Sequence, residues 1–153
     1  MQIQLSQKER MLLEDEKLQE EICIQKYQNY SNQAQDPQLK QLFSRISNEE
    51  QHHYTIIDQL LQGQQPNLSH GQQDQQNTTQ NNLQGAMNNQ SDKVLCSDLL
   101  STEKYVSSTY DTAIFESANP IVRQALQHIQ QDEQKHGEEL FNYMNSHGMY
   151  PVK

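Results

Sequence analysis

The chain has 153 residues, with 20 acidic against 11 basic side chains and a formal net charge of −9. This length predicts one domain, and the negative charge opposes the phosphate backbone of nucleic acid, so we expect no nucleic-acid partner. The first residues include no apolar run of signal-peptide length, and nowhere do 18 apolar residues follow one another, so we expect a chain made in soluble form with no membrane partner.

Residues 7–61 carry a largely apolar stripe of side chains at alternating spacings of three and four, which is typical of amphipathic helices. The pattern is broken once, at Asp36-Pro37, where an N-cap residue precedes a proline suited to the first turn of a helix. This segment therefore predicts two helices that form a hairpin.

Residues 62–91 contain 16 Gln or Asn residues and a single charge, without apolar periodicity. This composition predicts a linker that is poorly ordered except where Leu68 or Leu83 holds it against a helix. About 30 residues at roughly 3.3 Å each can return along the whole length of a helix. The helices on either side of the linker can therefore run parallel.

A second helical pattern runs through residues 92–147 and is broken at Asn119-Pro120. It repeats the first pattern at an offset of 83 residues. The matching residues are Glu20 and Glu103, Tyr27 and Tyr110, Pro37 and Pro120, Ile46 and Ile129, Glu50 and Glu133, and His53 and His136. The repeat predicts an all-α fold, a ferritin-like four-helix bundle of two helical hairpins joined by a long crossover, in a single domain over residues 1–153.

Each hairpin supplies one glutamate followed 30 residues later by a Glu-x-x-His motif. All six side chains fall in the apolar stripes of the predicted helices; they are Glu20, Glu50, His53, Glu103, Glu133 and His136. Positions i and i+3 share a helix face, so both members of a motif can bind one ion. Carboxylates and imidazoles suit iron(II) and manganese(II), and four carboxylates balance two divalent ions. The sequence therefore predicts a carboxylate-bridged pair of iron or manganese ions, and it assigns no catalytic residue.

Other readings of these residues stay open. The register Glu49-x-x-His52 lies off the apolar stripe, so we expect Glu49 and His52 at the surface. A bundle whose six polar side chains only hydrogen-bond one another is the alternative to a metal site. We expect Tyr27 and Tyr110 to pack in the core with hydrogen-bonded hydroxyls. Glu16 is either a further carboxylate near the site or a residue at the edge of the stripe.

Residues 92–150 resemble the Coat F family of spore coat proteins of endospore-forming bacteria, through DLLSTEKY, ANPIVRQAL, DEQKHGEELFNYM and the closing GMYPV. Residues 7–61 resemble a more divergent first hairpin of the same architecture. The resemblance implies a small helical protein synthesised in the mother-cell cytoplasm and located in the spore coat, with other spore coat proteins as partners. A homodimer is a candidate assembly.

The paired Glu and Glu-x-x-His sets also resemble those of rubrerythrin, bacterioferritin and manganese catalase, which react with oxygen or peroxide. This likeness covers the motif and its bundle. It implies an alternative function, a di-iron or di-manganese oxidoreductase acting on peroxide or oxygen. These 153 residues include no rubredoxin-like cysteine module to deliver electrons.

Overall fold

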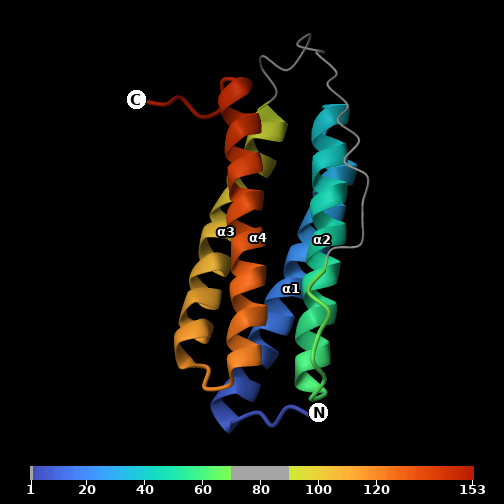
Figure 1. Ribbon diagram of the computed structural model, residues 1–153. Coiled ribbons are helices and arrows are strands. Elements are labelled where there is room, and N and C mark those ends of the chain that lie inside the picture. The colour runs from blue at the N-terminus through green and yellow to red at the C-terminus, as the bar shows by residue number, and fades with distance from the viewer. Residues whose placement is uncertain (1, 70–89) are drawn as a thin grey trace.

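Four helices pack side by side in the computed structural model, which describes residues 2–69 and 90–153 (Figure 1). They are α1 (Gln7–Gln33), α2 (Pro37–Leu61), α3 (Gln90–Glu116) and α4 (Pro120–Ser146). α1 and α2 form one hairpin, α3 and α4 form the other, and the hairpins meet through α1 with α3 and α2 with α4. α2 and α3 run in the same direction, so the chain changes ends of the bundle between them (Figure 1). The predicted all-α bundle of two hairpins with a long crossover is confirmed.

Local sequence explains where three of these helices begin. At the start of α1 the Glu9 N–H donates to the Ser6 hydroxyl at 3.0 Å, and the Ser6 N–H donates to Glu9 Oε1 at 2.8 Å, which makes a capping box. Asp36 and Asn119 each accept the backbone N–H two residues further on, at 3.0 and 2.8 Å, and a proline follows each of them. The turns predicted at these two places are confirmed.

The stripes predicted from residue spacing face the interior of the bundle. Fully buried large side chains come from all four helices, among them Leu13, Tyr27, Phe43, Ile46, Leu60, Leu99, Tyr110, Leu126 and Ile129. Removing such a side chain from water contributes about 1.5–3 kcal/mol to folding, so the core decides which face of each helix points inward. In the described ranges, no helix is both long and apolar enough to span a membrane.

After α2 the chain turns at Gly63, whose φ of 79° lies in the left-handed region that glycine adopts without strain. The Gly63 carbonyl accepts the Ile3 N–H at 2.8 Å, which holds the N-terminal segment against the end of α2. Leu68, one of the two residues expected to hold the linker, packs against the core. Leu83 and the rest of the predicted linker between residues 70 and 89 lie outside the described residues.

Two buried carboxylates tie each hairpin to the turn of the other. Glu9, near the start of α1, accepts two successive backbone N–H groups of the turn between α3 and α4, at 3.1 and 2.9 Å. Asp92, near the start of α3, accepts two successive N–H groups of the turn between α1 and α2, at 2.9 and 3.1 Å. Asp92 follows Glu9 by the same 83 residues that relate the hairpins. These two carboxylates, the turn clamps, therefore fasten both ends of the bundle.

Glu9→Ala should lower the free energy of unfolding by about 2–3 kcal/mol, because it removes a charged acceptor that is shared by two partly buried hydrogen bonds from the opposite turn. Burial acts to raise the pKa of Glu9, but hydrogen bonds from Ser6 and Asn119 lower it below the ordinary value of 4.5. The Glu9 contribution should therefore be complete above that value and disappear as the pH falls through the lower pKa of the folded state. Urea denaturation at neutral pH and near pH 3 measures both effects.

Asp15→Ala is the matched control, since Asp15 is an exposed acid on the same helix. It should change the free energy of unfolding by less than about 0.5 kcal/mol. Equal losses in the two variants would show that the contacts of Glu9 with the opposite turn add no stability.

Candidate metal centre

The six residues predicted as metal ligands lie together inside the bundle. Glu20 comes from α1, Glu50 and His53 from α2, Glu103 from α3, and Glu133 and His136 from α4. Each is 0–2% exposed. Helical register explains their direction, because a glutamate and the histidine three residues later lie on one face, here the face that points to the core. All four helices therefore contribute to one polar layer in the interior.

These side chains form two groups that share two members. The first group is Glu20, Glu50, His53 and Glu133, and the second is Glu50, Glu103, Glu133 and His136. Within each group, one potential ligand atom from every residue lies within 4.8 Å of the others. Glu50 and Glu133 belong to both groups. This arrangement suits two ions that share two carboxylates, each ion having one further glutamate and one histidine of its own.

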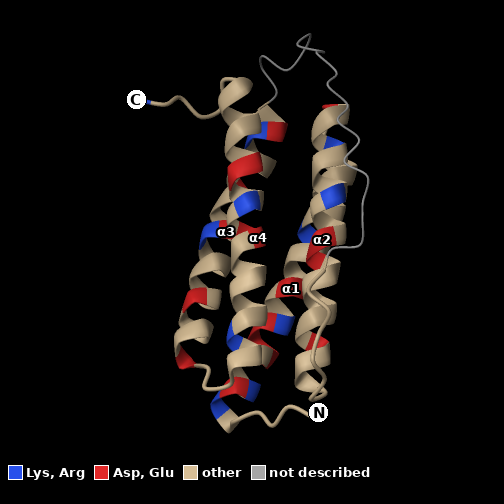
Figure 2. Cartoon of the chain, in the orientation of Figure 1, with Lys and Arg blue, Asp and Glu red and all other residues tan. Residues whose placement is uncertain are grey.

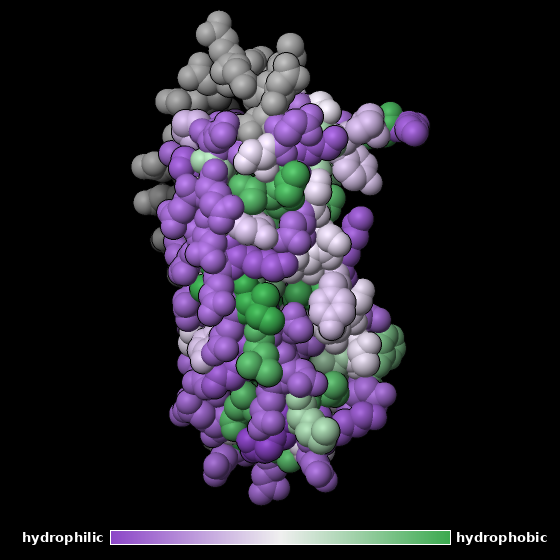
Figure 3. Space-filling view, turned by 180° about the vertical axis from the view of Figure 1, so that it is seen from behind, coloured by the Kyte–Doolittle hydropathy of each residue, from purple (hydrophilic) through white to green (hydrophobic). Residues whose placement is uncertain are grey.

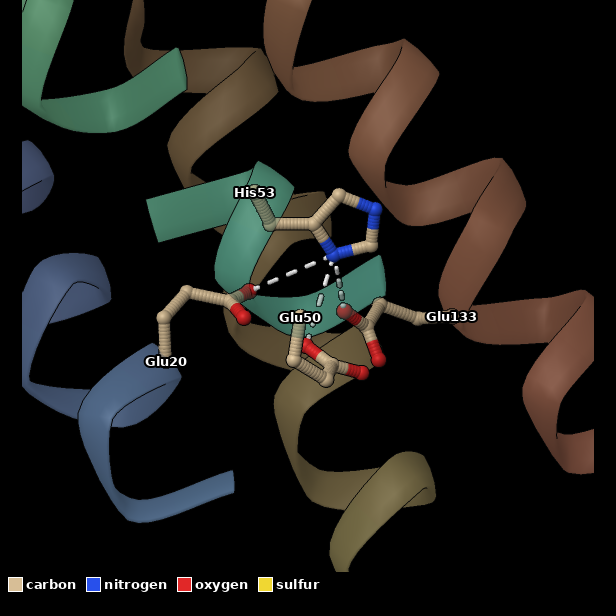
Figure 4. Close-up of side chains that lie close together, drawn as sticks. All are labelled: Glu20, Glu50, His53 and Glu133. Atoms are coloured by element: carbon tan, nitrogen blue, oxygen red, sulfur yellow. Dashed lines mark hydrogen bonds and ion pairs between the residues drawn. The ribbon is translucent and has the colours of Figure 1, made fainter. Parts of the chain in front are cut away.

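Figure 4 shows the first group, in which the imidazole of His53 turns Nδ1 toward the carboxylates. This nitrogen lies 3.0 Å from Glu133 Oε1, 3.3 Å from Glu50 Oε2 and 3.8 Å from Glu20 Oε1. His136 turns its own Nδ1 to the second group, 2.9 Å from Glu50 Oε1, and the two ring centroids are 5.9 Å apart. The structure thus brings together all six predicted residues. Their role as metal ligands stays a prediction.

The polar layer is short of hydrogen-bond donors. Among the described residues, one carboxylate oxygen of Glu20 and one of Glu103 lack a hydrogen-bond partner, while Glu50 Oε1 and Glu133 Oε2 both depend on His136 Nδ1, at 2.9 and 3.5 Å. A buried polar atom without a partner costs about 1–3 kcal/mol, and more where it is charged. Cations placed among these atoms would remove that cost and cancel the four negative charges. The residues present therefore fit the predicted pair of divalent ions.

The outer nitrogen of each histidine is held by a carboxylate of the other hairpin. His53 Nε2 lies 2.9 Å from Asp132 Oδ2, and His136 Nε2 lies 2.5 Å from Glu49 Oε2. Such a carboxylate fixes the orientation of a ligand imidazole and raises its basicity. The expectation that Glu49 is a surface residue is wrong, because its side chain is only 26% exposed and contacts His136. His52 is also partly buried.

A sequence signal for these outer carboxylates exists. An acidic residue directly precedes the inner glutamate of both motifs, as Glu49-Glu50 and Asp132-Glu133. One residue is a rotation of about 100° around a helix, which is why spacing alone places the outer acids away from the core. α2 and α4 pack against each other, so that edge of each helix faces the opposite hairpin instead of water.

One turn before each outer carboxylate stands a basic side chain. Arg45 in α2 donates to Glu49 Oε1 at 2.9 Å and also pairs with Glu139 of α4. His128, which follows Arg45 by 83 residues, places Nε2 3.7 Å from Asp132 Oδ2. The two halves of the centre therefore have the same outline but different outer bases.

Two buried tyrosines hold the glutamates that the groups do not share. The Tyr27 hydroxyl donates to Glu103 Oε1 at 2.5 Å, and the Tyr110 hydroxyl donates to Glu20. Burial, together with the nearby glutamate, raises the pKa of Tyr27 and of Tyr110 well above the usual range, so both remain protonated donors. The prediction that these tyrosines pack in the core with bonded hydroxyls is confirmed.

Without metal, the layer is balanced by protons. Burial and the charge of Glu133 raise the pKa of Glu103 to about 8, and burial with neighbouring carboxylates raises the pKa of Glu20 well above its usual range. Burial acts to lower the pKa of His53 and His136, but the surrounding carboxylates outweigh it and raise both pKa values well above 6.5. A metal ion entering the layer at neutral pH would therefore have to displace protons from imidazoles and carboxyl groups.

Two other groups on α1 lie beside this layer. Glu16 is buried and accepts the Thr109 hydroxyl at 3.2 Å, and burial raises its pKa to about 7. It is thus an additional buried carboxylate one turn from Glu20, although it belongs to neither group of four. Cys23 is fully buried, and burial raises the pKa of its thiol, so it packs as a neutral side chain.

The fold is similar to that of a solved two-domain protein from Anabaena variabilis, which contains DJ-1/ThiJ/PfpI-like and ferritin-like domains. The TM-score is 0.71 and the sequence identity 16%. The similarity covers 97% of this chain and 40% of that one, so this chain spans less than half the length of that protein. At this identity the likeness shows the fold alone, and that fold is ferritin-like, as predicted.

Residues 91–153, which are less than half of the chain, match the family model of the Coat F domain. The predicted resemblance to the Coat F family is confirmed over this segment, which comprises nearly all of α3 and the whole of α4. No curated protein matches the chain. The match includes Glu103, Glu133 and His136, whereas the ligands contributed by the first hairpin lie outside it.

Chelation of the metal-loaded protein should lower its melting temperature, and the loss should grow between about pH 6 and pH 8. In the metal-free folded chain, Glu103, His53 and His136 hold protons that the unfolded chain releases, since their folded pKa values are raised. Their contribution is complete below the unfolded pKa values and is lost as the pH rises through the folded ones. Each linked proton changes stability by about 1.4 kcal/mol per pH unit.

Differential scanning calorimetry of chelated and manganese-loaded samples across this pH range measures the difference. The metal-loaded centre has exchanged these protons for cations, so its melting temperature should change less with pH. Coincident melting temperatures at every pH would leave the layer as a hydrogen-bonded cluster without metal.

Proposed function

We propose that this chain is a ferritin-like protein of the spore coat that holds two divalent metal ions, iron or manganese, bridged by the carboxylates of Glu50 and Glu133. The single observation that carries the metal pair is that these two residues belong to both ligand groups. Two separate polar clusters would not need to share members. Two divalent cations repel each other, so a pair of them needs shared carboxylates between them to stay close together.

Each ion would have one histidine and one glutamate that the other ion lacks. The residues in these roles are His53 with Glu20 and His136 with Glu103. Each imidazole offers Nδ1 to the centre, while the outer carboxylate keeps a proton on Nε2 and so selects the tautomer. Mixed oxygen and nitrogen ligands favour iron or manganese over calcium and magnesium, which are bound through oxygen.

The spore coat assignment rests on the Coat F match over residues 91–153. Under this proposal the protein is synthesised in the mother-cell cytoplasm and joins other spore coat proteins in the coat. Acidic and basic residues are interspersed along the helices in Figure 2, and the net charge is −9. A chain of this charge repels the phosphate backbone, so we expect it not to bind nucleic acid. We also infer that residues 1–153 form one domain, since both hairpins contribute to one core.

Substitution of the ligands should remove metal in a pattern that follows the two groups. Glu50→Gln and Glu133→Gln each weaken a shared ligand and should lose both ions. Glu103→Gln weakens a ligand of one group only and should retain about one ion per chain. Metal content per chain after reconstitution and dialysis, measured by plasma mass spectrometry, distinguishes these results.

Glu138→Gln is the matched control, because Glu138 is an exposed glutamate of α4 close in sequence to His136. It should bind as much metal as the unsubstituted chain. The proposed centre would be refuted by shared-ligand variants that keep both ions, or by an equal loss of metal in Glu138→Gln.

The complete ligand set favours a second candidate function, a di-iron or di-manganese oxidoreductase acting on peroxide or oxygen. When bound, such a pair of ions supplies redox chemistry toward these substrates. The chain's own contribution would be to exclude bulk water and to hold protons nearby, and Glu16, with a pKa of about 7, is a buried group able to do so. This candidate shares the metal centre with the first and differs in turnover.

Peroxide consumption and metal content measured on the same sample separate the two functions. For a centre that only stabilises the bundle, metal-loaded and chelated proteins should remove peroxide at the same slow rate. An enzyme should instead consume peroxide at a rate proportional to metal content, at least about 100-fold faster than the chelated protein, and lose that activity in Glu50→Gln. Glu138→Gln serves again as the control with unchanged metal.

A further inference from the structure

The outward face of α1 carries a stripe of exposed apolar side chains. Met11, Leu18 and Ile22 follow one another at spacings of seven and four and are 59%, 59% and 45% exposed. These spacings place all three on one side of the helix, opposite the side that enters the core, and the exposed Asp15 lies between Met11 and Leu18 on that side. The view from behind the molecule shows apolar surface running between hydrophilic side chains (Figure 3). Aligned apolar residues of this kind mark interaction surfaces more often than scattered ones do.

A row of charges borders this stripe. Arg10, Glu14, Lys17 and Glu21 follow one another at spacings of four, three and four, so their signs alternate along one edge of α1. Together with Leu18 and with Leu61 at the end of α2, they line a groove beside the stripe. The surface therefore combines an apolar ridge with a hollow whose border alternates between basic and acidic residues.

The charge row is complementary to itself when a second copy of α1 is laid against it in the opposite direction. Arg10 then faces Glu21 of the second copy, and Glu14 faces Lys17 of the second copy. The same register sets Met11 opposite position 20 of the second copy. Met11 therefore lies between Leu18 and Ile22 of that copy. In a two-fold dimer with parallel helices the two rows would lie on opposite edges of the interface and could not pair with each other.

We propose that this face of α1 is the interface of a two-fold symmetric homodimer in which the two α1 helices run antiparallel. Burial of the stripe supplies most of the affinity, whereas the exposed ion pairs set direction and register. Lys17 Nζ already lies 3.0 Å from Asp58 Oδ1 of its own chain, so in the dimer it stands between two acids. Two-fold symmetry uses the same patch on both partners, as this self-complementary row requires.

Charge reversal tests the proposal with the full chain. The variant with Arg10→Glu and Lys17→Glu has an all-acidic row, and the variant with Glu14→Lys and Glu21→Lys has an all-basic row. Each variant alone should weaken dimerisation by about 30-fold or more, and an equimolar mixture should restore a dimer that contains one copy of each. Sedimentation velocity at about 1–100 μM, with light scattering for mass, measures these states.

Leu18→Glu tests the apolar stripe and should also raise the dimer dissociation constant by about 30-fold or more. Phe115→Glu is the matched control, since Phe115 is a 74% exposed apolar residue that belongs to α3 and not to α1. It should leave the dimer intact. Circular dichroism and melting temperature confirm that each variant is folded.

Three results would overturn the proposal. They are an unsubstituted chain that is monomeric over the whole concentration range, reversed variants that dimerise as well alone as in the mixture, and a dimer that is lost in Phe115→Glu but kept in Leu18→Glu. None of the substituted residues belongs to the ligand groups, so metal content reports on the proposed centre independently.

Discussion

The rest of the structure depends on how four carboxylates are held together in an interior that excludes water. Two unit charges about 4 Å apart interact by several kcal/mol even at an effective dielectric constant near 20, so the layer stands only if its charge is compensated. In the metal-free chain the compensation comes from protons on His53 and His136 and from the raised pKa values of Glu20 and Glu103. Cations would do the same without protons. Protons and cations would therefore compete for this layer.

Polar contacts in this layer and at the two ends of the bundle also join the two hairpins. The tyrosine hydroxyls, the outer carboxylates and the turn clamps all reach from one hairpin to the other, and each contact has a counterpart 83 residues away. Apolar packing is non-directional and would tolerate small shifts of one hairpin against the other. Directional hydrogen bonds at both ends and in the middle remove that freedom. The geometry of the centre and the alignment of the hairpins therefore depend on the same bonds.

The internal repeat explains why so much of this could be predicted from the sequence. It identifies the two hairpins, and helical spacing then places all six ligand candidates on the inward faces. The outer carboxylates Glu49 and Asp132 escaped the same reasoning, because a helical wheel shows which side of a helix faces the core but not what lies against its edge. Glu9 and Asp92 escaped it for a related reason, since their partners are backbone N–H groups of a distant turn. Contacts between hairpins depend on how the helices pack against one another, and the spacing of residues within one helix does not predict that packing.

Departures from the repeat matter as much as the repeat itself. Glu16 corresponds to Leu99 and Cys23 to Val106, and all four side chains are buried, so α1 places polar groups beside the layer where α3 places apolar ones. An exact duplicate would surround both ligand groups with the same side chains. Here the extra carboxylate and thiol lie one turn on either side of Glu20, while the equivalent surroundings of Glu103 are apolar. The scaffold is thus nearly two-fold symmetric, but the environment of the layer is not, and its two ligand groups differ in polarity and in the protons available to them.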